Sequence, residues 1–220
     1  MEVKINKPIL DLNDRLASEN KEFLREQGVY MLDLLASPGA GKTSLILATI
    51  NALKDRYRIA VIEGDIASDV DAVKVRETGI PAVQINTGGA CHLEAAMIAR
   101  ALEALEVPDL DLVIVENVGN LVCPTDFDLG EDTKAMILSV PEGHDKPLKY
   151  PGIFQAARAI VLNKVDTMPH FDFNEQEFRN SVARLNPHAV LFPLSATKNQ
   201  GVSAWTEWLS GQIQEKKSCN

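Results

Sequence analysis

The segment "ASPGAGKTSLI" follows an apolar run at residues 29–36 and carries the residue types that bind phosphate. Its glycines let the backbone curl so that successive N–H groups face an anion. A lysine then supplies positive charge for the outer phosphates, and a threonine hydroxyl can bind Mg²⁺. Compared with G-x-x-x-x-G-K-[ST], only the first glycine is replaced, by Ala36. At this helix start we expect phosphate contacts from Gly39, Ala40, Gly41, Lys42, Thr43 and Ser44.

A second motif, "NKVD", ends a later apolar run and is followed by "PLSATK". The Asp166 carboxylate can accept from N1–H and the 2-amino group of guanine, and adenine offers neither donor. Asn163 can bond the ring edge and hold the loop, and the stem of Lys164 can lie over the base. The backbone N–H of Ala196 can donate to the guanine 6-oxo group. The sequence therefore predicts a guanine nucleotide as the ligand of the phosphate loop.

Two further acids close apolar runs, Asp65 in "AVIEGD" and Glu116 in "LVIVEN". Together with Thr43 they are our candidates for holding Mg²⁺, and the backbone N–H of Gly119 for sensing the γ-phosphate. Exposed strand-end carboxylates without a metal remain the alternative. We expect Lys42 and Glu116 to act in catalysis, by stabilising charge on the phosphates and by holding the metal.

The segment after Gly119 offers little to activate an attacking water. Asn120 follows where many GTPases use a glutamine, and no arginine finger is identifiable in the sequence. We therefore expect slow intrinsic hydrolysis, accelerated by dimerisation or by a partner.

A cysteine and a histidine, Cys91 and His92, are adjacent at an expected helix start, and Cys123 lies just beyond the phosphate sensor. A helix dipole would lower the pKa of a thiol there, and thiolate with imidazole suits Ni²⁺ or Zn²⁺. Free cysteines are also commonly buried as small hydrophobic residues, so spacing alone leaves both interpretations open. One chain offers too few ligands for a tetrahedral site, which a second copy across a twofold axis, or water, would complete.

The elements that must position these residues alternate between apolar runs and helical patterns. This alternation predicts an α/β fold with a doubly wound, mostly parallel sheet of the P-loop NTPase type. An amphipathic helix at 8–27 precedes it, so we divide the chain into an N-terminal helical arm, 1–27, and a P-loop GTPase domain, 28–220. The predicted strands are 29–36, 58–65, 81–86, 110–117, 134–140, 159–166 and 189–195.

The composition limits which ligands and which cellular compartment we expect. The net charge is -9, which argues against binding to nucleic acid or to a membrane surface, because both require a basic face. The first residues break every apolar run with a charge, so no signal peptide is expected. Three cysteines, including Cys219 in the tail, form no CxxC pair, and we expect a reducing cytoplasm.

In order, "SPGAGKT", "EGD", "NTGGACHL", "ENVGNLVCPTDFDLGE", "NKVD" and "LSAT" resemble the HypB family of hydrogenase maturation GTPases over nearly the whole chain. The resemblance implies a GTP-dependent nickel-insertion factor for [NiFe]-hydrogenase, with metal on Cys91, His92 and Cys123 at a nucleotide-dependent dimer interface. It also implies a HypA-like nickel protein as partner and the hydrogenase large subunit as final acceptor. The cysteine-rich or histidine-rich N-terminal stretch of some relatives is absent here.

Two other readings stay open at this point. One is a related GTPase chaperone for urease or a cobalamin enzyme. The other is a regulatory nucleotide switch whose Cys-His pair is packed or holds structural zinc. For the nickel reading, we expect GTP and Mg²⁺ to draw residues 116–119 toward the γ-phosphate and to carry Cys123 with them.

Overall fold

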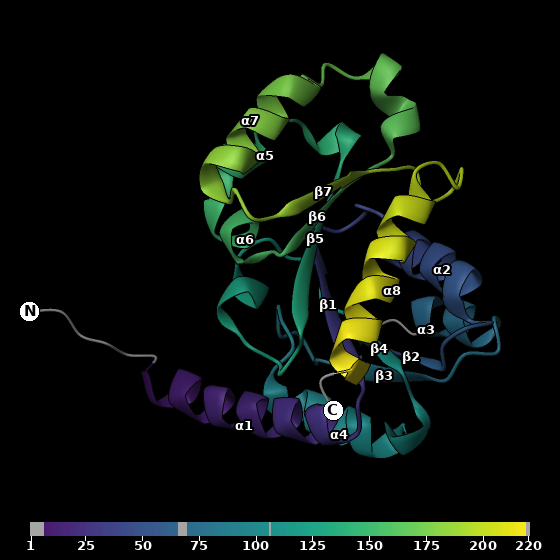
Figure 1. Ribbon diagram of the computed structural model, residues 1–220. Coiled ribbons are helices and arrows are strands. Elements are labelled where there is room, and N and C mark those ends of the chain that lie inside the picture. Colours follow the sequence, from purple (N-terminus) through teal and green to yellow (C-terminus); the bar gives the residue numbers. More distant parts are fainter. Residues whose placement is uncertain (1–6, 66–69, 106, 219–220) are drawn as a thin grey trace, which may run out of the picture.

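Seven parallel strands form one sheet in the order β3-β2-β4-β1-β5-β6-β7 (Figure 1). The computed structural model describes residues 7–65, 70–105 and 107–218, so Cys219 lies outside the described residues. All six strand pairs are parallel, which confirms the predicted sheet. The strands are β1 (Tyr30–Ala36), β2 (Ile59–Asp65), β3 (Ala82–Asn86), β4 (Leu112–Glu116), β5 (Thr133–Ser139), β6 (Ala159–Asn163) and β7 (Val190–Pro193).

Each predicted strand exists, and the largest boundary error is at β6. The prediction ran to residue 166, but the strand ends at Asn163. Lys164 has φ 60°, a left-handed conformation that a strand does not accommodate, and a 3₁₀ helix follows at Val165–His170. The "NKVD" motif therefore spans a strand end and a turn, which places its side chains at the edge of the sheet.

Helices cover both faces of the sheet, as the doubly wound prediction requires. One face packs against α2, α3 and α8, with the indole of Trp205 buried beneath α8. The other face packs against α1, α4, α6 and α7. The helices are α1 (Lys7–Glu26), α2 (Lys42–Leu53), α3 (Val70–Arg76), α4 (Ala95–Ala104), α5 (Lys146–Lys149), α6 (Pro151–Ala156), α7 (Glu175–Leu185) and α8 (Val202–Ser218), with 3₁₀ helices at Val107–Asp109, Cys123–Asp126 and Val140–Glu142.

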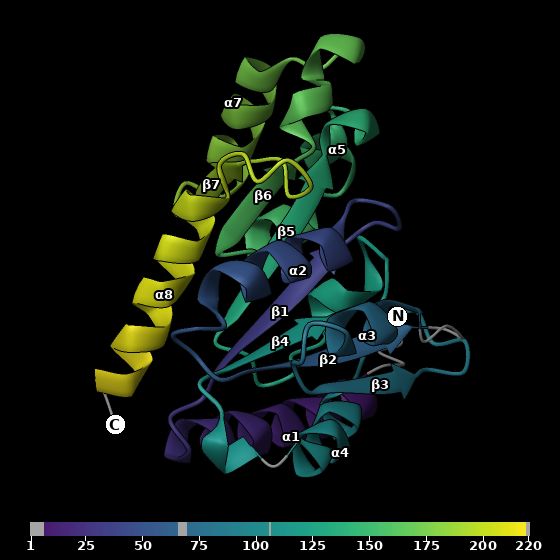
Figure 2. The same cartoon turned by 90° about the vertical axis from the view of Figure 1, so that its right-hand side faces the viewer.

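The N-terminal helix α1 lies alongside α4 (Figure 2). Two amides of α1 fix this arrangement. The Asn13 Oδ1 accepts from the backbone N–H of Ala95, and the Asn20 Nδ2 donates to the carbonyls of Ala95 and Leu129. Both amides are buried, so each bond protects a polar group that would otherwise be costly to bury. The division into an arm, 1–27, and a domain, 28–220, remains a prediction.

No helix among the described residues is long and apolar enough to cross a membrane.

We expect Gly130→Ala to lower the free energy of unfolding by more than Gly79→Ala. Both glycines have positive φ, 91° and 84°, so each substitution carries a left-handed strain of about 1–2 kcal/mol. A Cβ at Gly130 would also lie 2.5 Å from the carbonyl oxygen of Ala17 in α1, whereas a Cβ at Gly79 meets nothing within 4 Å. Urea unfolding of the two variants measures the difference. Equal losses would show that the contact of α1 with this loop contributes nothing to stability.

Candidate functional site

The loop between β1 and α2 forms the floor of a cavity of about 490 Å³ at the carboxyl ends of the strands. Gly39 and Gly41 have φ 77° and 99°, and Gly41 is the N-cap of α2. These left-handed turns leave the N–H groups at the start of α2 free to meet an anion. Of the predicted residues, the cavity is lined by Gly39, Gly41, Lys42, Thr43, Ser44, Asp65, Glu116, Gly119 and Lys164.

Two buried carboxyl groups meet beneath this cavity. Glu63 and Glu116 are register partners on the neighbouring strands β2 and β4. Burial, then the negative charge of Glu116, raises the pKa of Glu63 to about 9. Burial also raises the pKa of Glu116, against the opposing effect of the Lys42 ammonium group, whose Nζ lies 3.9 Å from Glu116 Oε1. The pair therefore holds a proton at neutral pH.

This acidic pair fits a hard divalent cation. Glu63 Oε1 and Glu116 Oε2 are buried and have no hydrogen-bond partner. Leaving such oxygens unpaired is costly, and Mg²⁺ is bound by carboxylate and hydroxyl oxygens. The Thr43 hydroxyl donates to Glu116 Oε1 over 3.2 Å, and Asp65 lines the same cavity. The three groups predicted for magnesium, Thr43, Asp65 and Glu116, thus line one cavity, and Glu63 is the register partner of Glu116 beneath it.

The predicted phosphate sensor lies directly against the phosphate loop. A Cβ added at Gly119 would approach the ring of Pro38 to 2.9 Å and its backbone nitrogen to 3.0 Å. Only a residue without a side chain permits this approach. A displacement of residues 118–119 would therefore change the contact between Gly119 and Pro38 of the phosphate loop.

The base-recognition residues are arranged around the buried amide of Asn163. Its Nδ2 donates to the Ala40 carbonyl, and its Oδ1 accepts from the N–H groups of Lys164 and Ala196. Lys164 Nζ donates to the Gly39 carbonyl over 2.7 Å. Asp166 is exposed on the turn that follows.

Two contacts bear on the predicted base recognition. The Asn163 amide joins three loops, the loop-holding part of its predicted role, and its bond to a ring edge stays a prediction. The N–H of Ala196 is already engaged with that amide, so a bond to a base oxygen would have to share or replace this contact. Ala40, Asn163, Asp166 and Ala196 do not line the phosphate cavity.

The three predicted ligands of nickel or zinc lie together, as the sequence predicted. The donor atoms of Cys91, His92 and Cys123 lie within 4.8 Å of one another, and no disulfide joins the cysteines. Gly88 and Gly89 have positive φ and turn the chain after β3, which returns Cys91 toward the segment after β4. Cys123 begins the 3₁₀ helix of that segment. Two sulfurs and an imidazole form a donor set for a soft or borderline divalent cation.

The expectation of a helix start at Cys91 is wrong. Helix α4 begins at Ala95, four residues later, and the cysteine lies in an exposed bend. A hydrogen bond with Cys123, followed by desolvation, raises the pKa of Cys91, and the helix expected to lower it begins four residues away. The thiol becomes a good ligand only when a cation displaces its proton.

The His92 ring is held in place on two sides. It stacks on Phe127 with ring centroids 3.8 Å apart. Nδ1 lies 3.6 Å from the Cys91 sulfur, and Nε2 lies 3.8 Å from Glu94 Oε1 without forming a hydrogen bond. Burial lowers the pKa of His92, which favours the neutral, ligating form of the ring at neutral pH.

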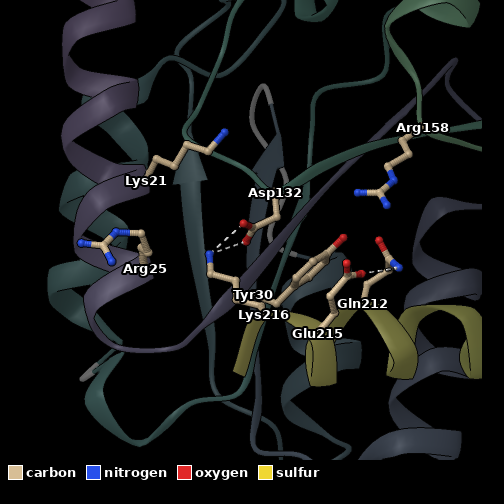
Figure 3. Close-up of a pocket in the computed structure, with 8 residues that line it drawn as sticks. All are labelled: Lys21, Arg25, Tyr30, Asp132, Arg158, Gln212, Glu215 and Lys216. Carbon is tan, nitrogen blue, oxygen red and sulfur yellow. Dashed lines mark hydrogen bonds and ion pairs between the residues drawn. The ribbon is translucent and has the colours of Figure 1, made fainter. Parts of the chain in front are cut away.

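A second cavity, of about 310 Å³, lies near the opposite edge of the sheet, between α1, α8 and the start of β5 (Figure 3). Within it, Lys216 Nζ donates to both oxygens of Asp132 over 2.7 Å, which ties α8 to the start of β5. No residue of the phosphate loop lines it, and neither does the sulfur cluster, formed by Cys91, His92 and Cys123. We assign this cavity to the docking of α8 and place the chemistry at the carboxyl ends of the strands.

Sequence reasoning missed Glu63, Asn117, Asp71, Lys74, Glu94 and Phe127. The first two carried a readable signal, because each is a polar residue in or directly after a run that is otherwise apolar on both faces. Asp71 and Lys74 form an ion pair at the rim of the phosphate cavity. They come from α3, and nothing in the sequence indicates where this short helix is placed.

We expect Gly41→Ala to weaken nucleotide binding more than Gly39→Ala. Both carry left-handed strain, but only a Cβ at Gly41 would lie 2.5 Å from the buried Nδ2 of Asn163. At Gly39 a Cβ meets nothing within 4 Å. Strain of about 1–2 kcal/mol corresponds to roughly a 5- to 30-fold loss, and displacement of Asn163 adds to it. Titration with a fluorescent guanine nucleotide measures both constants, and a larger loss for Gly39→Ala would contradict the assignment.

Comparison with known proteins places the chain in a family. Residues 31–193 match the family described as CobW/HypB/UreG, nucleotide-binding domain. The hydrogenase maturation factor HypB of Rhizobium leguminosarum bv. viciae is 48% identical over 94% of this chain and 69% of its own length. The "Hydrogenase/urease maturation factor HypB" of Helicobacter pylori is 40% identical over 97% of this chain and 89% of its own.

Solved structures agree with these sequence relationships. A crystal structure of the hydrogenase maturation factor HypB from Archaeoglobus fulgidus superposes with TM-score 0.87 at 38% identity, covering 92% of this chain and 99% of that one. HypB from Helicobacter pylori, crystallised in complex with nickel, gives TM-score 0.88 at 38% identity, covering 93% and 96%. With the phosphate loop and the shared fold, these matches establish that the chain belongs to the HypB hydrogenase maturation factors of the CobW/HypB/UreG nucleotide-binding family.

Proposed function

We propose that this chain is a GTPase that binds nickel as cargo and assists its insertion into [NiFe]-hydrogenase. One observation carries the proposal: three soft donors, Cys91, His92 and Cys123, meet beside the segment that leads out of the phosphate cavity. The nickel complex of the Helicobacter pylori relative supports nickel as the cargo. We propose a HypA-like nickel protein as donor and the hydrogenase large subunit as acceptor, and family membership supports both.

The nucleotide end of the proposal assigns a role to each group. The phosphates bind at Gly39, Ala40, Gly41, Lys42, Thr43 and Ser44, and Gly119 senses the γ-phosphate. Asp166 selects guanine, with Asn163, Lys164 and Ala196 holding the base loop. Lys42 neutralises charge as water attacks the γ-phosphorus and the bond to the β-phosphate oxygen breaks. Thr43, Asp65 and Glu116 would hold Mg²⁺, which when bound neutralises phosphate charge and orients the phosphoryl group.

The proposed nickel site is incomplete in a single chain. Three donors from one chain leave a tetrahedral cation short of one ligand, and a square-planar ion likewise. Since Cys91 is exposed, a second copy of the chain can reach the cluster. We propose that GTP-bound subunits pair at this surface and that hydrolysis separates them, which opens the coordination sphere to an acceptor.

Other functions are compatible with the same residues. The Helicobacter pylori relative is named for urease as well as for hydrogenase maturation, so a urease acceptor is the second candidate. A cobalamin-enzyme chaperone or a nucleotide switch with structural zinc is less well supported. A structural zinc site is closed by four ligands, and three donors meet here among the described residues.

We expect Asp166→Asn to shift base preference from guanine toward xanthine. The asparagine amide keeps an acceptor for N1–H but presents a donor where guanine has its 2-amino group, and xanthine has an oxygen there. The expected result is a loss of GDP affinity of tenfold or more with a gain for XDP, measured by competition against a fluorescent nucleotide. A variant that loses both nucleotides equally would argue that Asp166 only shapes the turn.

We expect nickel affinity to depend on Cys123 and on the bound nucleotide. Calorimetric titration of Ni²⁺ compares wild type with Cys123→Ala, each with GDP and with a nonhydrolysable GTP analogue. Loss of the thiolate should weaken binding at least tenfold, whereas Cys219→Ala, the matched control, should leave it unchanged. In wild type the two nucleotide states should differ about fivefold or more. Metal binding that ignores both Cys123 and nucleotide would remove the basis of the proposal.

A further inference from the structure

One side chain, Asn117, connects the two ends of the site. It follows directly after Glu116 at the end of β4 and is 1% exposed. Its Oδ1 accepts from two backbone N–H groups, that of Val118 over 2.9 Å and that of Leu93 over 3.2 Å. Val118 precedes the phosphate sensor Gly119, and Leu93 follows the metal donor His92. A single oxygen thus accepts from two segments: the sensor segment, residues 118–119, and the metal loop, residues 91–93.

The other end of this amide is anchored in the core. Nδ2 donates to both carboxylate oxygens of Asp33, over 3.1 and 3.3 Å, and the backbone N–H of Asn117 donates to the Leu34 carbonyl. Asp33 is fully buried in β1, the strand that leads into the phosphate loop. The side chain therefore cannot rotate away without leaving a buried carboxylate and a buried N–H unpaired.

Leu93 is itself held from below. It is 0% exposed, and a Cβ added at Gly64 in β2 would lie 2.7 Å from its side chain. Gly64 lines the phosphate cavity, next to Asp65. Leu93 consequently packs between β2 and Asn117, and a movement of either reaches the backbone of the metal loop.

A second, weaker link runs parallel to the first. Asn120 Nδ2 donates to the Cys91 carbonyl over 3.3 Å, and its Oδ1 accepts from the N–H of Val122. This bond is exposed, so water can replace it at little cost. The buried Asn117 bonds are the ones whose loss has a measurable consequence.

We infer that Asn117 is the positioning residue through which the nucleotide state sets the geometry of the metal donors. A shift of residues 118–119 toward a phosphoryl group must either pull Leu93 along or break one of the two bonds to Oδ1. If Leu93 follows, His92 moves with it because the two are adjacent; if a bond breaks, the metal loop loses the contact that fixes its backbone. The inference rests on the proposed function and adds the specific group that transmits the change.

The test compares the ratio of Ni²⁺ dissociation constants with GDP and with a nonhydrolysable GTP analogue. Asn117→Leu keeps the volume but removes the shared acceptor, so its ratio should fall to within about twofold of one. Asn117→Asp keeps an acceptor oxygen and should restore part of the wild-type ratio. The control is Asn186→Leu, because the Asn186 amide donates to three backbone carbonyls at the end of α6, none of them from a residue of the phosphate cavity or of the Cys91, His92 and Cys123 cluster. It should lower stability and leave the ratio at the wild-type value.

The outcomes separate the two proposals. A wild-type ratio in folded Asn117→Leu overturns the role of Asn117 and leaves the proposed function standing. A ratio of one in wild type overturns both. If Asn117→Leu does not fold, the amide resonances of Leu93 and Val118 in wild type decide. Both should shift when the GTP analogue replaces GDP, and a Leu93 amide that does not respond overturns the inference.

Discussion

The parallel pairing of β1 with β4 is the constraint on which the rest of the structure depends. Parallel strands bring their carboxyl ends to one edge, and this pair places the phosphate loop beside residues 116–119. β2 then adds Glu63 and Asp65 from the other side of β4. β3 leads into the metal loop at the same edge. The metal donors therefore lie beside the phosphate loop without a further strand to position them.

This arrangement requires charge where a sheet of this kind is normally apolar. Burial and repulsion from Glu131 raise the pKa of Asp33 to about 8, and Glu63 shows a comparable shift. Isolated buried carboxylates would be strongly destabilising, so each is given a neutralising neighbour or a proton. Asp33, with its pKa raised, holds a proton and accepts from the Asn117 amide, and Glu116 lies beside the Lys42 ammonium. The groups that bind ligands therefore also decide how stable the empty site is.

Much of this could be predicted from sequence, because the signals were local. A glycine-rich loop before a lysine, and apolar runs alternating with helical patterns, depend on backbone conformation and period alone. The approach of Cys91 to Cys123 was also foreseen, since parallel strands share an edge. Long-range packing was not predictable. The true start of α4 at Ala95 is set by the Asn13 amide of α1, 82 positions away in sequence, and no local pattern near Cys91 records this contact. Asn117 carried a local signal, as a polar residue directly after an apolar run, but its partners could not be predicted because they come from three separate segments.

The last turn of α8 is bound to the far edge of the sheet, where Lys216 and Lys217 pair with Asp132 and Asp111. Both carboxylates lie just before a strand begins, the edge opposite to the phosphate loop and the sulfur cluster. A purification tag or a fluorophore attached to the last described turn of α8 is therefore remote from the phosphate loop and from the Cys91, His92 and Cys123 cluster. Labelled protein can report complex formation by energy transfer without obstructing it, whereas a label on Cys91 would occupy the very ligand under study.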